Sequence, residues 1–474
     1  MQFPFVGPCY QHRSPNASAQ RCVNLYVENI EVDEDKRQIL VGTPGKELVC
    51  TLPTSPVRAQ WTTSQGRSFA VGGNRFYELF ANGSYIDRGG LSTSSGVVSI
   101  ADNGLQMMLV DGPYGYILTL ATNLYQAITD PDFPGATKVV FQDGYFIFNS
   151  PNTGRFYITA LYDGFNVNSL DFATAEGSPD DIITLLSDHR NIWLFGKGRS
   201  IEIYFNSGNA TFPFERIQGA FMELGCAAKD AAVKLDNTVY WIGADENGHG
   251  IIYKAENFSP VRISTHAIEY AIQRYSTIAD AVAYTYQQEG HAFCVFSFPS
   301  GNATWVYDAA TGLWHERAYL NNGVLERDRA NNHQFAFGEH WVGDWESGNI
   351  YRLSLDYYTD NLQEIKRIRA CRHLSGDGKN IFYHGLQILL EAGVGLDGIQ
   401  QGTDPQGMLR ISRDGGHVFS TEKTAPLGKI GNYIARCDYN RLGCGRDTVF
   451  EWSITDPVKV VITGAVLRAT AGEA

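Results

Sequence analysis

Apolar and polar positions alternate in short runs through most of the chain, and the clearest runs lie between residues 139 and 205. Two similar units follow each other there, each with a polar turn, an aromatic and β-branched run, a glycine-containing loop and a second alternating run. The first runs are Tyr145–Phe148 and Ile192–Phe195, and the second are Phe156–Thr159 and Ile201–Phe205. Runs of this composition between Gly and Asn turns predict paired β-strands.

The same unit recurs on both sides of this stretch. Further copies run over residues 66–79, 103–118, 236–254, 290–308 and 338–353, so the turns return at roughly 40–50 residues, the period of a four-stranded propeller blade. A single blade leaves both of its faces uncovered, whereas a ring of blades packs sheet on sheet and leaves only short edges. The sequence therefore predicts a six- or seven-bladed β-propeller over residues 61–358.

The two ends of the chain lack this period. Six prolines interrupt residues 1–60, which predicts an irregular N-terminal arm with a short strand near residues 20–28 and a turn at Thr43–Gly45. Residues 359–474 contain short alternating runs separated by turns, which predict a C-terminal β-sandwich-like domain. The predicted fold class is thus all-β, in three parts: an arm, a propeller and a sandwich.

Two segments inside the propeller region depart from the strand pattern. Residues Ser264–Tyr275 place apolar side chains at helical spacing after a Ser/Thr cap, which predicts a short amphipathic helix between blades. Residues Leu320–Asn332 are mostly polar and predict an exposed loop.

The charge balance limits the classes of function. A net charge of −13 argues against a broad, non-specific nucleic-acid surface, although it is compatible with DNA that passes through a wide acidic channel. The N-terminal residues lack the pattern of a secretory signal, and no run of about 18 apolar residues predicts a membrane span. We therefore expect a protein made in a cytoplasm, with the eight scattered cysteines free and structural.

One motif suggests carbohydrate chemistry. Residues Ser412–Phe419 come close to the sialidase Asp-box S-x-D-x-G-x-x-W, with Phe419 in the place of the usual Trp. In such a box the carboxylate, here that of Asp414, accepts backbone N–H bonds within a hairpin, as in an Asx-type turn. The single copy lies outside the predicted propeller, so we interpret it as a structural turn in preference to a sialidase site.

Acidic pairs and one basic segment are the other candidates. Asp180–Asp181 and the pair Asp130 and Asp132 could supply the paired carboxylates of a glycosidase, and Asp245–Gly250 could hold Ca²⁺ through oxygen ligands. Solvated turns explain these acidic residues better. The basic segment Lys366–His373 could contact a phosphate backbone or an acidic neighbouring subunit, and a solvated strand face is an equally good explanation.

The nucleotide-binding, zinc-protease and serine-hydrolase motifs are missing from the sequence. Gly196–Ser200 is predicted as a hairpin turn and not as a phosphate loop, because strands flank it on both sides. We therefore assign no catalytic, cofactor-binding or metal-binding residue, expect no cofactor, and do not expect an enzyme.

Several stretches, taken in order, resemble a known family. Cys22–Glu28, the Thr43–Gly45 turn, Ser200–Phe205 with Gly225, and Leu409–Gly415 are similar to stretches of the packaged-DNA stabilisation proteins, or tail hubs, of short-tailed Salmonella-type bacteriophages. The likeness spans nearly the whole chain in order and length.

The resemblance implies a structural protein of the virion tail, a late head-completion protein or tail accessory factor. Such hubs form a homohexameric ring below the portal and its adaptor protein, extend the DNA channel, and keep the packaged genome from leaking before genome ejection. They also seat the tail needle or plug, beside the tailspike proteins, while DNA passes without sequence-specific binding. Two rivals remain: a carbohydrate-active propeller, glycan-binding or sialidase-like, and a general interaction scaffold.

Overall fold

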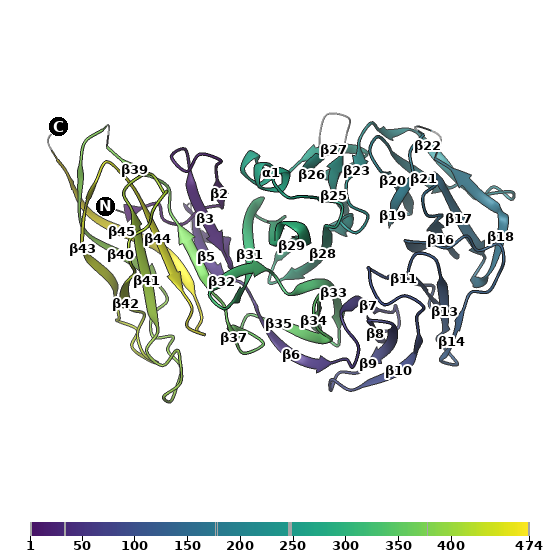
Figure 1. Ribbon diagram of the computed structural model, residues 1–474, viewed down its shortest axis with the longest axis horizontal. Helices are drawn as coiled ribbons and strands as arrows, with labels where there is room; N and C mark the ends of the chain where they lie inside the picture. Colours follow the sequence, from purple (N-terminus) through teal and green to yellow (C-terminus); the bar gives the residue numbers. More distant parts are fainter. Residues whose placement is uncertain are drawn as a thin grey trace.

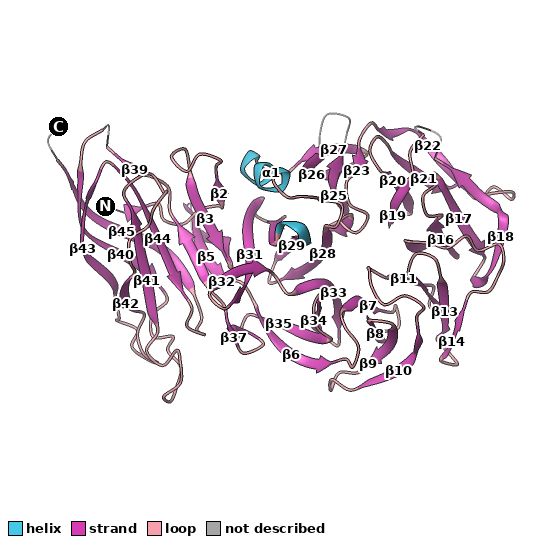
Figure 2. Ribbon diagram, in the orientation of Figure 1, coloured by secondary structure: helices cyan, strands magenta, loops and turns pink. Residues whose placement is uncertain are grey.

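The computed structural model describes residues 2–32, 35–175, 177, 179–244, 249–376 and 378–472. Strands dominate throughout this part of the chain, as the short alternating runs require (Figure 2). A ring of small sheets forms one part of the molecule, and a two-layered sandwich lies beside it along the long axis (Figure 1).

The ring contains seven sheets within the described residues, which confirms the predicted propeller and gives it seven blades. Blade 1 contains β7 (Val57–Thr62), β8 (Ser68–Gly72), β9 (Arg75–Leu79) and β10 (Tyr85–Gly90), and blade 2 contains β11 (Ser99–Asp102), β12 (Gln106–Val110), β13 (Gly115–Thr119) and β14 (Leu124–Ala127). Blade 3 contains β15 (Val139–Gln142), β16 (Tyr145–Asn149), β17 (Arg155–Ala160) and β18 (Asp163–Thr174). Blade 4 contains β19 (Ile182–Asp188), β20 (Asn191–Gly196), β21 (Ile201–Asn206) and β22 (Phe214–Met222). The stretch between residues 139 and 205 therefore belongs to blades 3 and 4.

The remaining blades follow the same antiparallel order. Blade 5 contains β23 (Gly225–Cys226), β24 (Val233–Leu235), β25 (Thr238–Ala244), β26 (His249–Glu256) and β27 (Ser259–Arg262). Blade 6 contains β28 (Val282–Gln288), β29 (His291–Phe298), the 3₁₀ turn η1 (Pro299–Gly301), β30 (Ala303–Asp308) and β31 (Leu313–Asn321). Blade 7 contains β33 (Ala330–Ala336), β34 (Glu339–Asp344), β35 (Asn349–Ser354) and β6 (Gly45–Thr51).

Buried side chains from neighbouring sheets make the core between blades. Between blades 3 and 4, for example, Ile147, Phe156 and Ile158 pack against Leu194 and Tyr204. Similar clusters lie between blades 1 and 2, 2 and 3, 4 and 5, 6 and 7, and 7 and 1. Sheet-on-sheet packing thus explains the aromatic runs of the sequence.

The ring is closed by a strand from the start of the chain. β6 pairs antiparallel with β35 and becomes the outer strand of blade 7, while β33 of the same blade contacts β7 of blade 1. Gly45, the first residue of β6, lies close to the backbone of Tyr357, and its N–H donates to the carbonyl of Tyr357 over 3.0 Å. Short strands β36 (Thr359–Asp360) and β37 (Gln363–Glu364) extend this sheet.

Both ends of the chain build the sandwich. One sheet has the order β4 (Leu25–Val32), β5 (Asp35–Gly42), β45 (Val461–Ala471), β40 (Ile381–Leu390), β43 (Cys437–Gly445), with β1 (Gln2–Phe3) on β45. The other has β3 (Ala19–Val23), β38 (Arg367–Ala370), β44 (Asp447–Ile454), β41 (Gln406–Ser412) and β42 (Lys423–Pro426), with β2 (Tyr10–Gln11) and β39 (Leu374–Ser375) at its edges. β3 also pairs with β31, so this second sheet is continuous with blade 6.

Two expectations from the sequence are corrected. Residues 1–60 are not an irregular arm, because β1 to β5 belong to the sandwich and β6 and β7 to the propeller. Residues Leu320–Asn332 do not form an exposed loop, because β32 (Val324–Arg327) pairs with β31, and Asp328 and Ala330 are buried. β1, β3 and β5 pair with strands far away in the sequence, so the local prolines gave no sign of them, whereas β32 pairs with the strand directly before it.

The helix between blades is confirmed. α1 (His266–Gln273) begins after Thr265, whose side chain accepts a hydrogen bond from the N–H of Ile268. Ile268 and Ile272 are buried on one face, as the helical spacing predicted.

Closure of the ring by β6 gives the first prediction. A Cβ atom at Gly45 would lie 2.1 Å from the carbonyl oxygen of Tyr357, so Gly45→Ala must displace the start of β6. We expect a loss of about 1–3 kcal/mol in the free energy of unfolding, with faster hydrogen exchange in β35. Gly198→Ala is the matched control, because a Cβ there meets no atom within 4 Å. Equal unfolding midpoints for the two variants would contradict the role of β6.

Candidate functional site

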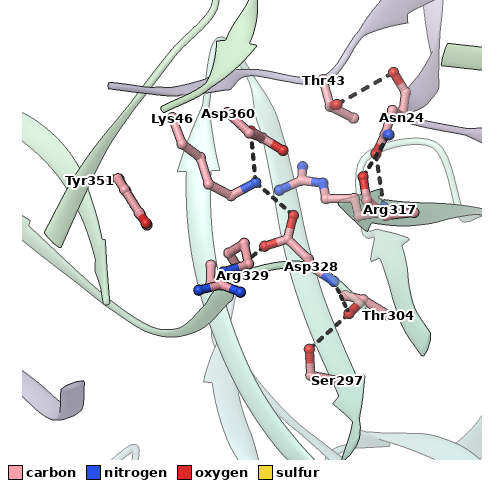
Figure 3. A network of polar contacts seen from close by, with 12 residues as sticks. Asn24, Thr43, Lys46, Ser297, Thr304, Arg317, Asp328, Arg329, Tyr351 and Asp360 are labelled. Carbon is pink, nitrogen blue, oxygen red and sulfur yellow. Dashed lines mark hydrogen bonds and ion pairs between the residues drawn. The ribbon is translucent and has the colours of Figure 1, made fainter. Parts of the chain in front are cut away.

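The most elaborate polar site of the described residues lies where blade 6, blade 7 and the sandwich meet (Figure 3). We call it the junction, and define it by Asn24, Lys46, Arg317, Asp328 and Asp360. These residues come from the turn after β3, from β6, from β31, from the segment between β32 and β33, and from β36.

Asn24 joins three segments at once. Its side-chain amide donates to the carbonyl oxygens of Ala318 (2.8 Å) and Lys366 (2.9 Å), and its Oδ1 accepts from the N–H of Ala318 (2.9 Å). Its backbone has a φ of 54°, which asparagine tolerates better than most residues. Thr43 also donates to the Asn24 carbonyl, so the turn between β5 and β6 is fixed to the same point.

Lys46 carries a buried positive charge. Its Nζ lies 2.7 Å from Oδ2 of Asp328 and 3.1 Å from Oδ1 of Asp360. Burial opposes the charge of Lys46, but the two carboxylates outweigh burial and raise its pKa. Burial likewise opposes ionisation of Asp328, yet Lys46 holds the pKa of that carboxyl below its ordinary value. Burial raises the pKa of Asp360, and the charge of Asp328 adds to this effect. Lys46 thus favours the ionised form of Asp328, whereas its charge offsets the burial of Asp360 only in part.

Asp328 is held in place by further contacts. Its backbone N–H donates to Thr304 (3.1 Å), and its Oδ1 accepts from the N–H of Ala330 (2.7 Å). Thr304 is in turn within 2.9 Å of the hydroxyl of Ser297 (Figure 3). Arg317 is fully buried and donates to the hydroxyl of Tyr286. Blade 6 therefore presents a pre-formed carboxylate to Lys46 of blade 7.

A second ion pair extends the junction toward solvent. Arg329 binds Asp344 over 2.9 Å, and Asp344 also accepts from the hydroxyl of Tyr351 over 2.7 Å. The adjoining cavity has a volume of about 150 Å³ and is lined by Lys46, Tyr319, Arg329, Ser347, Asn349, Tyr351, Asp360 and Asn361. Pockets for small molecules usually measure about 300–1,000 Å³, so this cavity is small for a ligand site, and the geometry indicates a structural connection.

The basic segment Lys366–His373 does not meet solvent as a charged face. Arg367 and Arg369 are fully buried in β38. Arg369 donates to the carbonyl oxygens of Phe5 (2.8 Å) and Pro8 (2.9 Å) and to the side chain of Gln20 (3.0 Å). Burial lowers the pKa of Arg367 to about 10. Arg369 thus holds the N-terminal segment, and because both arginines are buried, neither phosphate binding nor simple solvation describes them.

The other cavity of interest lies at the centre of the propeller. It has a volume of about 510 Å³ and is lined by residues of β7, β19, β24, β28 and β33, with Ala232. Gln60 and Gln334 are buried on its wall, and burial, helped by His340, lowers the pKa of His333 to about 3. Lys234 pairs with Asp188 over 2.8 Å. The wall therefore combines apolar side chains with neutral polar ones, and Lys234 is the charged residue among those that line it.

The Asp-box-like residues form a turn, as interpreted from the sequence. Oδ1 of Asp414 accepts from the hydroxyl of Ser412 (2.6 Å) and from the N–H groups of His417 (3.1 Å) and Val418 (3.0 Å). Ser412 and Phe419 pair across the hairpin. The carboxylate is thus occupied within its own loop.

The carboxylates of Asp130, Asp132 and Asp180 also accept backbone hydrogen bonds, here from neighbouring segments. Asp130 accepts from the N–H of Val167 and Asp132 from the N–H of Ser169, each over 3.1 Å. Asp180 accepts from the N–H groups of Gly198 and Arg199 over 2.9 Å. That contact fixes the Gly196–Ser200 turn between β20 and β21, which is a hairpin as predicted. The candidate calcium loop Asp245–Gly250 lies at residues 245–248 outside the described part.

The described residues contain no cluster of His, Cys, Asp and Glu that could hold a metal ion. In the same part of the chain, no helix has the length and hydropathy to span a membrane. All eight cysteines are free, and seven of them are buried, as expected.

Sequence reasoning missed the junction. Asn24 lies within the strand predicted near residues 20–28, and Lys46 follows the turn predicted at Thr43–Gly45. Nothing local indicates that they contact Ala318 or Asp328, which lie almost 300 positions away. The polar composition of residues 320–332 suggested an exposed loop. One signal of the junction was present in the sequence, namely a polar run between two predicted strands of a closed ring.

Two family profiles match the chain and together cover most of it. The profile described as the β-propeller of bacteriophage P22 Gp10 matches residues 1–358, and the profile described as the β-sandwich of the same protein matches residues 366–470. No curated protein matches the chain in sequence.

Solved structures with a similar fold are distant. The extracellular domain of the hybrid two component system BT4673 from B. thetaiotaomicron is 11% identical, with a TM-score of 0.44 over 78% of this chain and 44% of that one. The N-terminal domain of Nup159 is 9% identical (TM-score 0.42; 71% of this chain, 99% of that one). The WD40 β-propeller domain of Doa1 is 12% identical (TM-score 0.39; 65% and 96%).

Removal of the junction cation is the second prediction. Lys46→Met leaves Asp328 and Asp360 buried without their counter-ion, so we expect the free energy of unfolding to fall by about 3–5 kcal/mol. Lys459→Met is the control, because Lys459 and its partner Glu391 are 51% and 45% exposed and such a pair contributes about 1 kcal/mol or less. Denaturant unfolding of both variants measures the difference. Similar losses in the two variants would contradict the buried triad.

The third prediction concerns pH. His315 is buried beside Arg317, and its Nε2 has no hydrogen-bond partner among the described residues. Burial lowers the pKa of His315 well below its ordinary value, and repulsion by Arg317 and His291 lowers it further. Below about pH 6.5 the unfolded chain therefore binds a proton that the folded chain refuses, and stability falls as the pH falls, by up to about 1.4 kcal/mol per pH unit for this residue. His315→Phe should show a shallower loss between pH 7 and pH 5. Parallel pH profiles would contradict the assignment.

Proposed function

The chain belongs to the family of bacteriophage P22 Gp10 and is a phage structural protein of the tail and stabilisation class, and we propose that it forms the hub of a short tail. The observation that carries the proposal is the match of both family domains, in order, over residues 1–358 and 366–470. In this role, copies form a hexameric ring below the portal and its adaptor protein, extend the DNA channel, retain the packaged DNA, and seat the tail needle or plug beside the tailspikes.

The junction supports a role as a wall. Asn24, Lys46 and Asp328 connect blade 6, blade 7 and the sandwich through buried contacts, and β3 continues blade 6 into the sandwich. A buried, paired charge allows one arrangement and penalises others, because separation leaves it without a partner. These contacts oppose separation of the two domains, which suits a subunit that must keep a channel in shape.

The charge distribution supports passage of DNA without tight binding. The chain has a net charge of −13, and two arginines of its densest basic segment, Arg367 and Arg369, are buried. Non-specific DNA binding depends on exposed lysines and arginines that displace counter-ions from phosphates. A mostly acidic surface repels the polyanion instead.

The structure does not favour the carbohydrate-active alternative. The carboxylates of Asp414, Asp130, Asp132 and Asp180 accept backbone hydrogen bonds in their own loops or in neighbouring ones. We therefore propose a role without catalysis. Turnover of a glycan by the isolated protein would count against it.

The fourth prediction concerns the particle. Phage particles assembled without this protein should lose packaged DNA, and electron microscopy of complete particles should place the protein below the portal and adaptor. Complementation with the wild-type chain or with Gly198→Ala should restore DNA-filled heads, whereas Gly45→Ala, which disturbs ring closure, should restore fewer. Density elsewhere in the particle, or full retention of DNA without the protein, would overturn the proposal.

A further inference from the structure

The junction holds an amine between two carboxyl groups in an arrangement that a simple ion pair lacks. Among the lysine side chains that the structure describes, Lys46 is the one within ion-pair distance of two carboxylates, at 2.7 Å from Asp328 and 3.1 Å from Asp360 (Figure 3). The three side chains are 6%, 3% and 5% exposed. Burial keeps bulk water away from the amine and from both carboxyl groups, so these groups meet each other and not solvent.

We propose that Lys46 and Asp328 join in an amide bond, a covalent cross-link between two side chains of the same chain. Nζ of Lys46 is the nucleophile, and Cγ of Asp328 is the carbon that it attacks. Asp360 carries a proton between the reacting atoms. The proposal does not depend on the role in a phage tail, because every contact that it uses lies within one folded chain.

The bond forms with the loss of one water molecule and needs no other reactant. The ammonium of Lys46 first gives a proton to Oδ2 of Asp328, and the neutral amine then adds to Cγ. Asp360 accepts a second proton from the nitrogen and passes it to Oδ2, which leaves as water. The new C–N bond thus replaces the C–Oδ2 bond, and the third proton of the ammonium stays on the amide nitrogen.

The contacts of Asp328 favour attack on its own carboxyl group. Its Oδ1 accepts from the N–H of Ala330 over 2.7 Å, so the oxygen that becomes negative when the amine adds already has a hydrogen-bond donor. Its Oδ2, the oxygen that leaves, faces Nζ of Lys46. The N–H of Asp328 donates to Thr304 over 3.1 Å, which fixes the backbone. Asp360 lies further from Nζ and is the group left to carry the proton.

Opposing effects act on the reaction. The raised pKa of Lys46 keeps most of the amine charged, so the bond forms from the minor fraction in which the proton has moved to Asp328. Fixed geometry compensates, because well-placed groups in one molecule react as if each were present at about 10⁵–10⁸ M, and each chain has to react once. Amide formation also removes two buried charges, which are costly to keep away from water. The raised pKa of Asp360 suits a group that must take up and release a proton near neutral pH.

The cross-link closes the propeller covalently. Lys46 lies in β6, the outer strand of blade 7, and Asp328 lies just before β33 of the same blade. The two residues are 282 positions apart, and blades 1 to 6 lie between them in the sequence. The bond therefore encloses six blades in one covalent loop, and β6 can no longer move away from the start of blade 7.

Mass spectrometry of the purified full-length chain tests the proposal. We expect the intact mass to be lower than the mass of the sequence by one water molecule. Trypsin cleaves after lysine and arginine, but it should no longer cleave after Lys46. Residues 38–58 should instead be recovered joined to the dipeptide Asp328–Arg329. Fragmentation of this linked peptide identifies the two side chains that are joined.

Another ion pair of the same chain serves as the matched control. Lys138 lies 2.8 Å from Asp230, and these side chains are 17% and 11% exposed. In the described part of the chain Lys138 has this one carboxylate partner, so no second carboxyl group is in place to carry a proton. We expect no link between Lys138 and Asp230.

Two variants separate the roles of the reacting groups. Lys46→Arg keeps a cation but removes the amine, so the chain should keep its full mass. Asp360→Asn keeps the size of the side chain but cannot carry the proton. We expect its link to form about a hundredfold more slowly or worse, measured as the linked fraction of residues 38–58 at increasing times after synthesis.

Other results overturn the proposal in distinguishable ways. A folded wild-type chain that keeps its full mass after prolonged incubation, and that trypsin cleaves after Lys46, would refute the bond. A link to residues 353–366, which contain Asp360, would show that the wrong carboxyl group was assigned. Equal rates in Asp360→Asn and the wild type, or a link between Lys138 and Asp230, would refute the need for a second carboxyl group. None of these results bears on the tail hub, which the particle experiment tests separately.

Discussion

Each sheet of the propeller has two apolar faces, and every other feature of the chain follows from the need to cover both. Seven sheets achieve this because blade 7 receives its outer strand from β6, so that the last blade is made from both ends of the propeller sequence. Without β6 the sheet of blade 7 would have β35 as an unpaired outer edge. The ring therefore depends on a strand that begins more than 300 positions before its partner, β35.

Use of the N-terminal segment for closure ties the propeller to the sandwich. β3, β4 and β5 lie just before β6 and are built into the two sheets of the sandwich, so the connection leaves little freedom between the domains. Asn24, Lys46 and Asp328 occupy this crossing. Buried charges of this kind add little net stability compared with an apolar core, but they specify one arrangement, since each alternative leaves a charge unpaired.

Local patterns predicted the local structure well. The aromatic runs at Tyr145–Phe148 and Ile192–Phe195 became central strands of blades, and the cap at Thr265 began the one described helix. Local patterns could not predict which segments, far apart in the sequence, contact each other. The prolines near the N-terminus suggested an irregular arm, yet the carbonyls of Phe5 and Pro8 bind the buried Arg369. The polar residues between positions 320 and 332 suggested an exposed loop, yet Asp328 pairs with Lys46 in the interior. A charged residue can be expected on the surface only when no residue elsewhere in the chain forms a buried ion pair with it. The sequence of one strand or loop does not reveal such a residue.

The interleaving of the chain ends has a consequence for synthesis. β5 pairs with β45, and β1 pairs with the same strand, which ends at Ala471. β1 and β5 are therefore made long before β45 and wait for it before their sheet is complete, while blades 1 to 6 can form in order as they emerge. A chain that is cut short by even one C-terminal strand leaves β1 and β5 without their partner. Completion of the sandwich thus requires that synthesis has passed β45, and chains cut short before this strand lack a finished subunit to offer to an assembly.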